Sequence, residues 1–196
     1  FAMKSASDLQ QAVGGTEAVF GELAGRIDEV ADSAARTSGL SERAFREATT
    51  SIGGQLKRMT GDVDLAADQS IRLTEVAADL AATYGGTTKE AVDALGAAFR
   101  AVNAKAVELG LARTETEVSE NAKAQATLAL IMEQSADAQG QFARESDSAA
   151  GAMQIARAEM ENASAEIGGA LLPLVADLAT GVADLATWFA NLPEPI

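Results

Sequence analysis

Apolar residues recur along the chain at intervals of three or four, which is the spacing of one face of an α-helix. Four stretches show this spacing before residue 105. Their apolar members are Val19, Leu23, Ile27, Val30 and Ala34; Phe45, Ile52, Leu56 and Met59; Leu73, Val76, Leu80 and Tyr84; and Val92, Leu95, Phe99 and Val102. No stretch shows the alternation of apolar and polar residues that is typical of a half-buried strand. The pattern predicts an all-α chain of helical hairpins or a bundle, with long helices.

Glycine sets the predicted helix ends in most of the chain, because the three prolines lie at residue 173 and beyond. Gly14-Gly15 followed by Thr16 predicts the end of a short helix and the cap of the next one. Gly85-Gly86 predicts a second such junction, where Thr87 and Glu90 have the spacing of a capping box. Further breaks or starts are expected at Gly39-Leu40-Ser41, Gly61-Asp62, Thr114 with Glu117, Gly140 and Gly151.

The segment from Ile167 to Leu192 differs from the rest, since Asp177 and Asp184 are its only charged residues. Its larger apolar residues alternate spacings of four and three, as in a coiled coil with valine at position a and leucine at position d. These predicted interface residues are Leu171, Val175, Leu178, Val182, Leu185, Phe189 and Leu192. We therefore expect a helical module over residues 1–166 and a hydrophobic heptad segment over residues 167–196. The heptad segment is predicted to join identical copies into a small homo-oligomer such as a trimer.

The composition argues against an enzyme. Histidine and cysteine are both absent, which removes the usual general base at neutral pH, the thiol nucleophile and the commonest zinc ligands. No serine or lysine lies in a recognisable nucleophile motif, and no phosphate-binding loop is present. The sequence therefore predicts no catalytic residues and no bound cofactor. The net charge of −14 further predicts no direct binding of nucleic acid, because an acidic surface repels phosphates.

Asp62, Asp64 and Asp68 form the one tight carboxylate cluster worth testing as a metal site. A calcium-binding loop needs further oxygen ligands at alternate positions and a turn glycine, but residues 66 and 67 are both alanine. We favour a structural interpretation, in which Asp62 or Asp64 caps a helix that begins near Leu65. No metal site is therefore predicted.

A series of short motifs, spread over nearly the whole chain, occurs in a characteristic order. In order, they cover residues 7–20, 39–41, 77–81, 85–96, 123–126, 131–134, 137–144, 161–163 and 166–173. Each motif is weak alone, but their order and spacing together resemble the helical region of the tail tape-measure proteins of long-tailed bacteriophages. The chain departs from that family at residues 100–103, where Arg100 runs directly into Ala101-Val102-Asn103 without a Gly-Glu turn. This departure argues against one continuous helix across residues 100–103.

The resemblance implies a structural protein that occupies the lumen of the tail tube, sets tail length during assembly and is released during DNA ejection. The implied partners are identical copies and the tail-tube, tail-tip and tail-assembly chaperone proteins, with host-membrane contact through residues 167–192. The implied location is the virion, after assembly in the bacterial cytoplasm. We also expect the chain to be part of a longer polypeptide.

Two other classes of protein stay open at this point. A helical coiled-coil adaptor accounts for the heptad segment but not for the ordered motifs. In a membrane-active helical protein, residues 167–192 would span the bilayer. The two aspartates would then cost about 2.5–3.5 kcal/mol each on insertion scales, which disfavours this alternative.

Overall fold

The structure is a computed structural model that describes residues 2–108 and 117–190, with side chains described for residues 2–101 and 122–177. Within these ranges every regular element is helical, so the all-α prediction is confirmed. The elements are α1 (Ala2–Phe20), a 3₁₀ turn η1 (Gly21–Leu23), α2 (Ala24–Ala31), α3 (Ala34–Ser38), α4 (Glu42–Thr60), α5 (Val63–Tyr84), α6 (Thr88–Glu108), α7 (Glu117–Gln134), α8 (Gln141–Glu145) and α9 (Ala149–Ala190).

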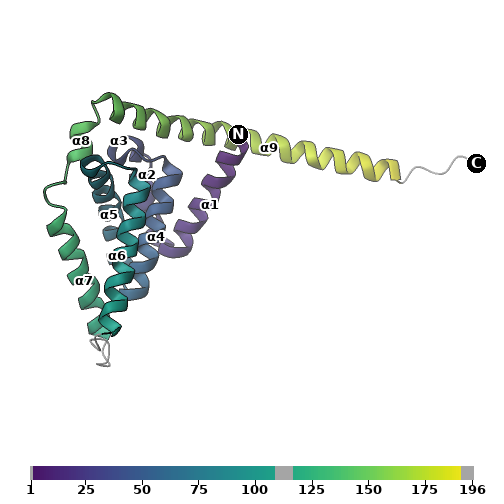
Figure 1. Cartoon of the computed structure of the whole chain (residues 1–196). Coiled ribbons are helices and arrows are strands. Elements are labelled where there is room, and N and C mark those ends of the chain that lie inside the picture. The colour runs from purple at the N-terminus through teal and green to yellow at the C-terminus, as the bar shows by residue number, and fades with distance from the viewer. Residues whose placement is uncertain (1, 109–116, 191–196) are drawn as a thin grey trace, which may run out of the picture.

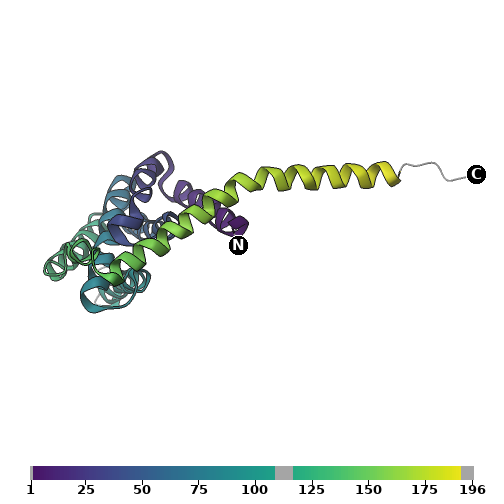
Figure 2. The same cartoon turned by 90° about the horizontal axis from the view of Figure 1, so that it is seen from above.

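Helices α1 to α7 form a bundle, and α9 runs across one end of it (Figure 1). The second half of α9 continues past the bundle as a single projecting helix, which Figure 2 shows from above. The most extensive contact of α9 is with α1. The molecule therefore has two parts of different shape: a bundle, and an arm that consists of residues 169–190 of α9.

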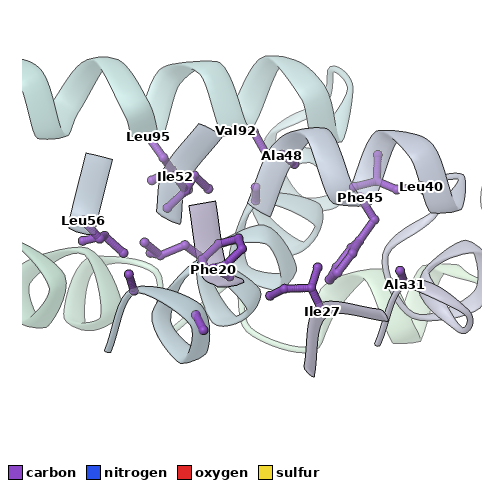
Figure 3. Close-up of a cluster of buried hydrophobic side chains, with 14 of the residues drawn as sticks. Phe20, Ile27, Ala31, Leu40, Phe45, Ala48, Ile52, Leu56, Val92 and Leu95 are labelled. Carbon is purple, nitrogen blue, oxygen red and sulfur yellow. The ribbon is translucent and has the colours of Figure 1, made fainter. Parts of the chain in front are cut away.

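The hydrophobic core lies between α4 and α5 and is completed by the end of α1, by α2, α6 and α7 (Figure 3). Its largest fully buried side chains are Phe45, Phe99, Ile27, Ile52, Leu56 and Leu73. The predicted apolar stripes of α4 and α6 thus face the core as far as their side chains are described. The stripe of α5 ends earlier than predicted, because Tyr84 is 75% exposed.

Most predicted helix ends are confirmed by their hydrogen bonds. Gly39 ends α3 with a left-handed φ of 66°, and the Ser41 hydroxyl accepts a hydrogen bond from the Ala44 N–H. Gly61 ends α4 in the same way, with φ 70°. The Asp62 carboxylate then accepts a hydrogen bond of 2.9 Å from the Leu65 N–H. Asp62 is therefore a helix cap, as the structural interpretation predicted.

Thr87 and Glu90 form the predicted capping box at the start of α6. The Thr87 N–H donates to the Glu90 carboxylate at 2.8 Å, and the Glu90 N–H donates to the Thr87 hydroxyl at 3.2 Å. The backbone and hydroxyl donors of Thr87 hold the pKa of Glu90 below its ordinary value. The contribution of this cap to folding stability is therefore fully present above the ordinary pKa of glutamate, and it is lost as the pH falls through the lowered pKa of Glu90.

The predicted break at Gly14-Gly15 is wrong, because α1 runs through both residues. Thr16 is fully buried against α4 and does not cap a helix. Its hydroxyl donates to the Ala12 carbonyl at 3.0 Å and lies 3.2 Å from the Thr50 hydroxyl. Thr16 therefore contacts α4 from within a continuous helix and does not mark a chain reversal, and a Cβ at Gly15 would make only an ordinary contact with Thr50 at 3.8 Å.

Replacement of Gly14 by alanine should therefore stabilise the protein by about 1 kcal/mol, since alanine is the better helix former and its Cβ would meet no atom within 4 Å. Urea unfolding would measure the change. Gly39→Ala is the matched control and should destabilise, because its left-handed backbone is strained for any residue with a Cβ. A loss of stability in Gly14→Ala would instead support a chain break at this position.

Three further expectations are corrected. Helix α6 continues without interruption across residues 100–103, in spite of the missing Gly-Glu turn. Helix α7 ends at Gln134, before Gly140, which has φ 75° and directly precedes α8, and Gly151 lies within the first turn of α9. The stripe from Val19 to Ala34 is divided by η1 and by a turn at residues 32–33. Thr114 lies outside the described residues, and α7 begins at Glu117.

Candidate interaction surface on the last helix

Helix α9 contains 42 residues and crosses the predicted boundary between residues 166 and 167 without a break. The Ser148 hydroxyl caps its first turn by accepting a hydrogen bond from the Gly151 N–H at 3.1 Å. A Cβ at Gly151 would collide with the backbone carbonyl of Glu145, so only glycine allows the close approach of α8 to α9. The bundle and the heptad segment therefore share one helix, and their division into two domains stays a prediction.

The first half of α9 lies on the bundle through its smallest residues. Gly151, Ala158, Ala165 and Gly168 are buried at intervals of seven, seven and three residues, which places them on one face. A Cβ at Gly168 would collide with the Ala2 carbonyl of α1. The absence of a side chain at residue 168 therefore lets the two helices approach closely.

Polar groups fix the position of this half of α9 on the bundle. The Glu42 N–H at the start of α4 donates to the Asn162 amide oxygen at 2.8 Å, so α9 supplies a cap for another helix. The Gln154 side chain donates to the Gly39 carbonyl at 3.4 Å. These contacts, which are more than 100 residues apart in sequence, align α9 with the N-terminus of α4.

Ion pairs add to this alignment. Arg43 of α4 binds Glu161 at 2.7 Å, and Arg36 of α3 lies 3.6 Å from Glu159. Partial burial disfavours the charge of Arg43, but hydrogen bonds to Glu161 and Glu47 offset this effect, so the pKa of Arg43 lies above its ordinary value. Both pairs are partly exposed, so each adds at most about 1 kcal/mol to stability.

Helix α9 carries most of the exposed large apolar side chains of the described part of the chain. Of the nine large hydrophobic side chains that are exposed in the described part of the chain, six lie on this helix: Met153, Met160, Ile167, Leu171, Leu174 and Val175. Four of them, Met153, Met160, Ile167 and Leu174, are spaced seven residues apart. We call these six residues the apolar stripe. Such a contiguous row is typical of an interaction surface.

The predicted interface residues are only partly described. Leu171 and Val175 belong to the apolar stripe and are 41% and 40% exposed. The side chains of Leu178, Val182, Leu185 and Phe189 lie outside the described ones, and Leu192 lies outside the described residues. The interface itself is therefore a prediction still. Sequence reasoning missed Met153, Met160 and Ile167, although their seven-residue spacing continues the heptad towards the start of α9.

The carboxylate cluster at the start of α5 is a salt-bridge site. Arg26 of α2 lies 3.0 Å from Asp64 and 3.0 Å from Asp68, while Asp62 caps the helix. Among the described residues, no group of three or more potential ligands is arranged to hold a metal ion. In the same part of the chain, no helix combines the length and the apolar character required to cross a membrane.

Comparison with known protein families, with curated protein sequences and with solved structures finds no match to this chain. The arguments for its function therefore come from its own sequence and geometry.

Proposed function

We propose that the chain is a segment of a bacteriophage tail tape-measure protein, which sets tail length in the tube lumen and leaves during DNA ejection. The ordered motifs of the sequence suggest this function. The structural observation that carries it is α9, a continuous helix that leaves the bundle as a rod (Figure 2) and has large exposed apolar side chains. A rod of this kind suits a structural part of an elongated assembly.

The geometry of a single helix suits a molecular ruler. A helix rises about 1.5 Å per residue, so the 42 residues of α9 span about 63 Å, and its length scales with the number of residues. A lone helix with its side chains is only about 10–12 Å wide, which fits a narrow tube. On this proposal the protein is located in the tail lumen of the virion after assembly in the host cytoplasm.

Identical copies are the proposed partners of the apolar stripe. Burial of a large apolar side chain contributes about 1.5–3 kcal/mol, so the exposed Leu171, Leu174 and Val175 favour association. Heptad spacing suits a parallel pairing of identical helices into a small oligomer such as a trimer. The tail-tube, tail-tip and chaperone proteins would contact the assembled form.

A double replacement of Leu174 and Val175 by aspartate should dissociate this oligomer without loss of helicity in the bundle. The reason is that two charges in a coiled-coil seam cannot be buried without a partner. The matched control, Gly169→Asp with Ala176→Asp, adds the same charge at two exposed positions on the opposite face and should leave the assembly intact. Light scattering would give the mass and circular dichroism the helicity. A wild-type chain that is monomeric at every concentration would contradict self-association.

In-frame deletions in the full-length gene should shorten phage tails by about 1.5 Å for each helical residue removed. Electron microscopy of the virions would measure tail length. The control replaces the deleted segment by a helical segment of equal length, which should restore the normal tail. Tails of unchanged length in the deletion virions would remove the tape-measure function and leave a helical adaptor as the better explanation.

A further inference from the structure

The docked half of α9, residues 149–168, contributes little to the hydrophobic core. Its buried residues are glycines and alanines, and none of its described side chains belongs to the core cluster. Of its large apolar residues, Met153, Met160 and Ile167 are exposed, and Ile155 is half-buried. Separation of this segment from the bundle would break the close contact between α1 and α9, but Ile155 is the one large side chain of the segment that it would expose further. Its cost would therefore be smaller than that of unfolding the core.

Polar contacts hold this segment in place, and water can replace each of them. The Asn162 amide caps the start of α4, but Ser41 already caps the same helix end from within its own chain segment. Arg43 keeps a second carboxylate partner, Glu47, when Glu161 leaves. Arg43 is thus not left as an unpaired charge, and the Glu42 N–H, which loses the Asn162 oxygen, is left for water to bind.

We propose that residues 149–168 form a detachable clasp, which leaves the bundle as an intact helix while α2, α4, α5 and α6 stay folded. The turn at residues 146–148 supplies the pivot, since it is the short connection to α8. The released segment would extend the free rod by about 30 Å, at about 1.5 Å for each of its residues. The inference concerns a conformational equilibrium of the chain itself, and it stands whether or not the chain belongs to a phage tail.

The face that the clasp hides is continuous with the arm. Gln154, Glu161 and Gly168 follow one another at intervals of seven, and the next positions in this series are Val175 and Val182. Position a of the predicted heptad therefore runs from the bundle contact into the arm along one side of the helix. Detachment would make this whole side of α9 accessible at once.

Single cysteines provide the test, because the chain contains no cysteine of its own. Ala158→Cys places a thiol in the buried contact between α9 and the bundle, where residue 158 is 5% exposed. Ala77→Cys places the same thiol in the fully buried core, and Ala163→Cys places it on the exposed face of α9. The three variants carry the same change in three environments, and labelling by a maleimide reports when each thiol becomes accessible.

A detachable clasp predicts that Cys at position 158 reacts at least about 100-fold faster than Cys at position 77, because local opening precedes global unfolding, but more slowly than Cys at position 163. Equal rates at positions 158 and 77 would overturn the proposal, since α9 would then leave only when the whole protein unfolds. Equal rates at positions 158 and 163 would also overturn it, since α9 would then not be docked at all.

A second variant separates release from general loss of stability. Gly168→Ala should accelerate labelling at position 158 about tenfold or more and leave labelling at position 77 unchanged, since its Cβ would collide with Ala2 and Ala6 of α1 and not with the core. Gly169→Ala is the matched control, because its Cβ meets no atom within 4 Å, and it should change neither rate. Acceleration at both positions 158 and 77 by Gly168→Ala would show that α9 and the core unfold together, which contradicts the clasp.

Discussion

Replacement of Gly53 by alanine is expected to lower the free energy of unfolding by about 1–3 kcal/mol. The same change one residue later, at Gly54, should raise it by up to about 1 kcal/mol. A Cβ at Gly53 would collide with the ring of Phe20, which is 2% exposed and enclosed by the core. A Cβ at Gly54 would make only ordinary contacts, with Arg58 at 3.6 Å and Val19 at 3.9 Å. The two glycines therefore separate packing from helix propensity.

Urea unfolding followed by circular dichroism would measure both Gly53→Ala and Gly54→Ala. A combined Gly53→Ala and Phe20→Leu variant should lose less stability than the sum of the two single changes, because the smaller side chain makes room for the Cβ. Equal stabilisation by both glycine replacements would contradict the close contact between α1 and α4.

Replacement of Arg46 by alanine is expected to destabilise the protein by about 1–3 kcal/mol. The Arg46 side chain is only 6% exposed and binds Asp28 of α2 and Glu42 of its own helix. Burial disfavours its charge, but the hydrogen bonds to these carboxylates outweigh this effect and raise the pKa of Arg46. Removal of the guanidinium leaves two acidic groups next to each other and empties a space at the edge of the core.

Arg26 is the matched control for Arg46. It also binds two carboxylates, Asp64 and Asp68, but its side chain is 45% exposed. Arg26→Ala should therefore cost less than about 1 kcal/mol. Thermal or urea unfolding in low and high salt would compare the two, and only the Arg26 contribution should be screened strongly by salt. An equal loss from both arginines would show that burial does not decide the strength of these ion pairs.

The sequence predicted the helix ends that depend on neighbouring residues. Gly39, Gly61 and the Thr87–Glu90 pair act within five residues of themselves, so their local pattern was enough. Gly14, Gly15 and Thr16 carried the same local pattern, but Thr16 serves the contact with α4, which no neighbouring residue reveals. A residue pattern that is typical of a helix cap can thus serve a contact with a residue far away in the chain.

The sequence could not predict helix caps that come from distant parts of the chain, because their partners are not neighbouring residues. The Asp79 carboxylate of α5 accepts hydrogen bonds from the Gly140 N–H at 2.8 Å and the Phe142 N–H at 3.0 Å, and so fixes the start of α8. Asn162 does the same for α4. These two side chains are separated from their partners by 61 and 120 residues, so only the folded chain brings them together.

The candidate surface was predicted in part. The heptad pattern from Leu171 onwards indicated an apolar stripe, and Leu171 and Val175 are exposed as that stripe requires. The pattern before Ile167 is weaker, because the bundle-facing positions hold glycine, alanine and polar residues in place of large apolar ones. The heptad prediction relied on positions a and d, and it therefore missed Met153 and Met160, which lie at position g, directly before position a.

Pro173 lies within α9, five residues after the contact between Gly168 and Ala2. Proline has no N–H, so the carbonyl of Gly169 lacks its helical donor. Gly168 and Gly169 have no Cβ, so the backbone is least restricted at these two residues. In mechanical terms, α9 is a lever clamped at one end, and its most compliant section lies at the edge of the clamp. A sideways displacement of the arm is therefore taken up by bending at residues 168–173, and little of that displacement reaches the part of the helix that rests on the bundle.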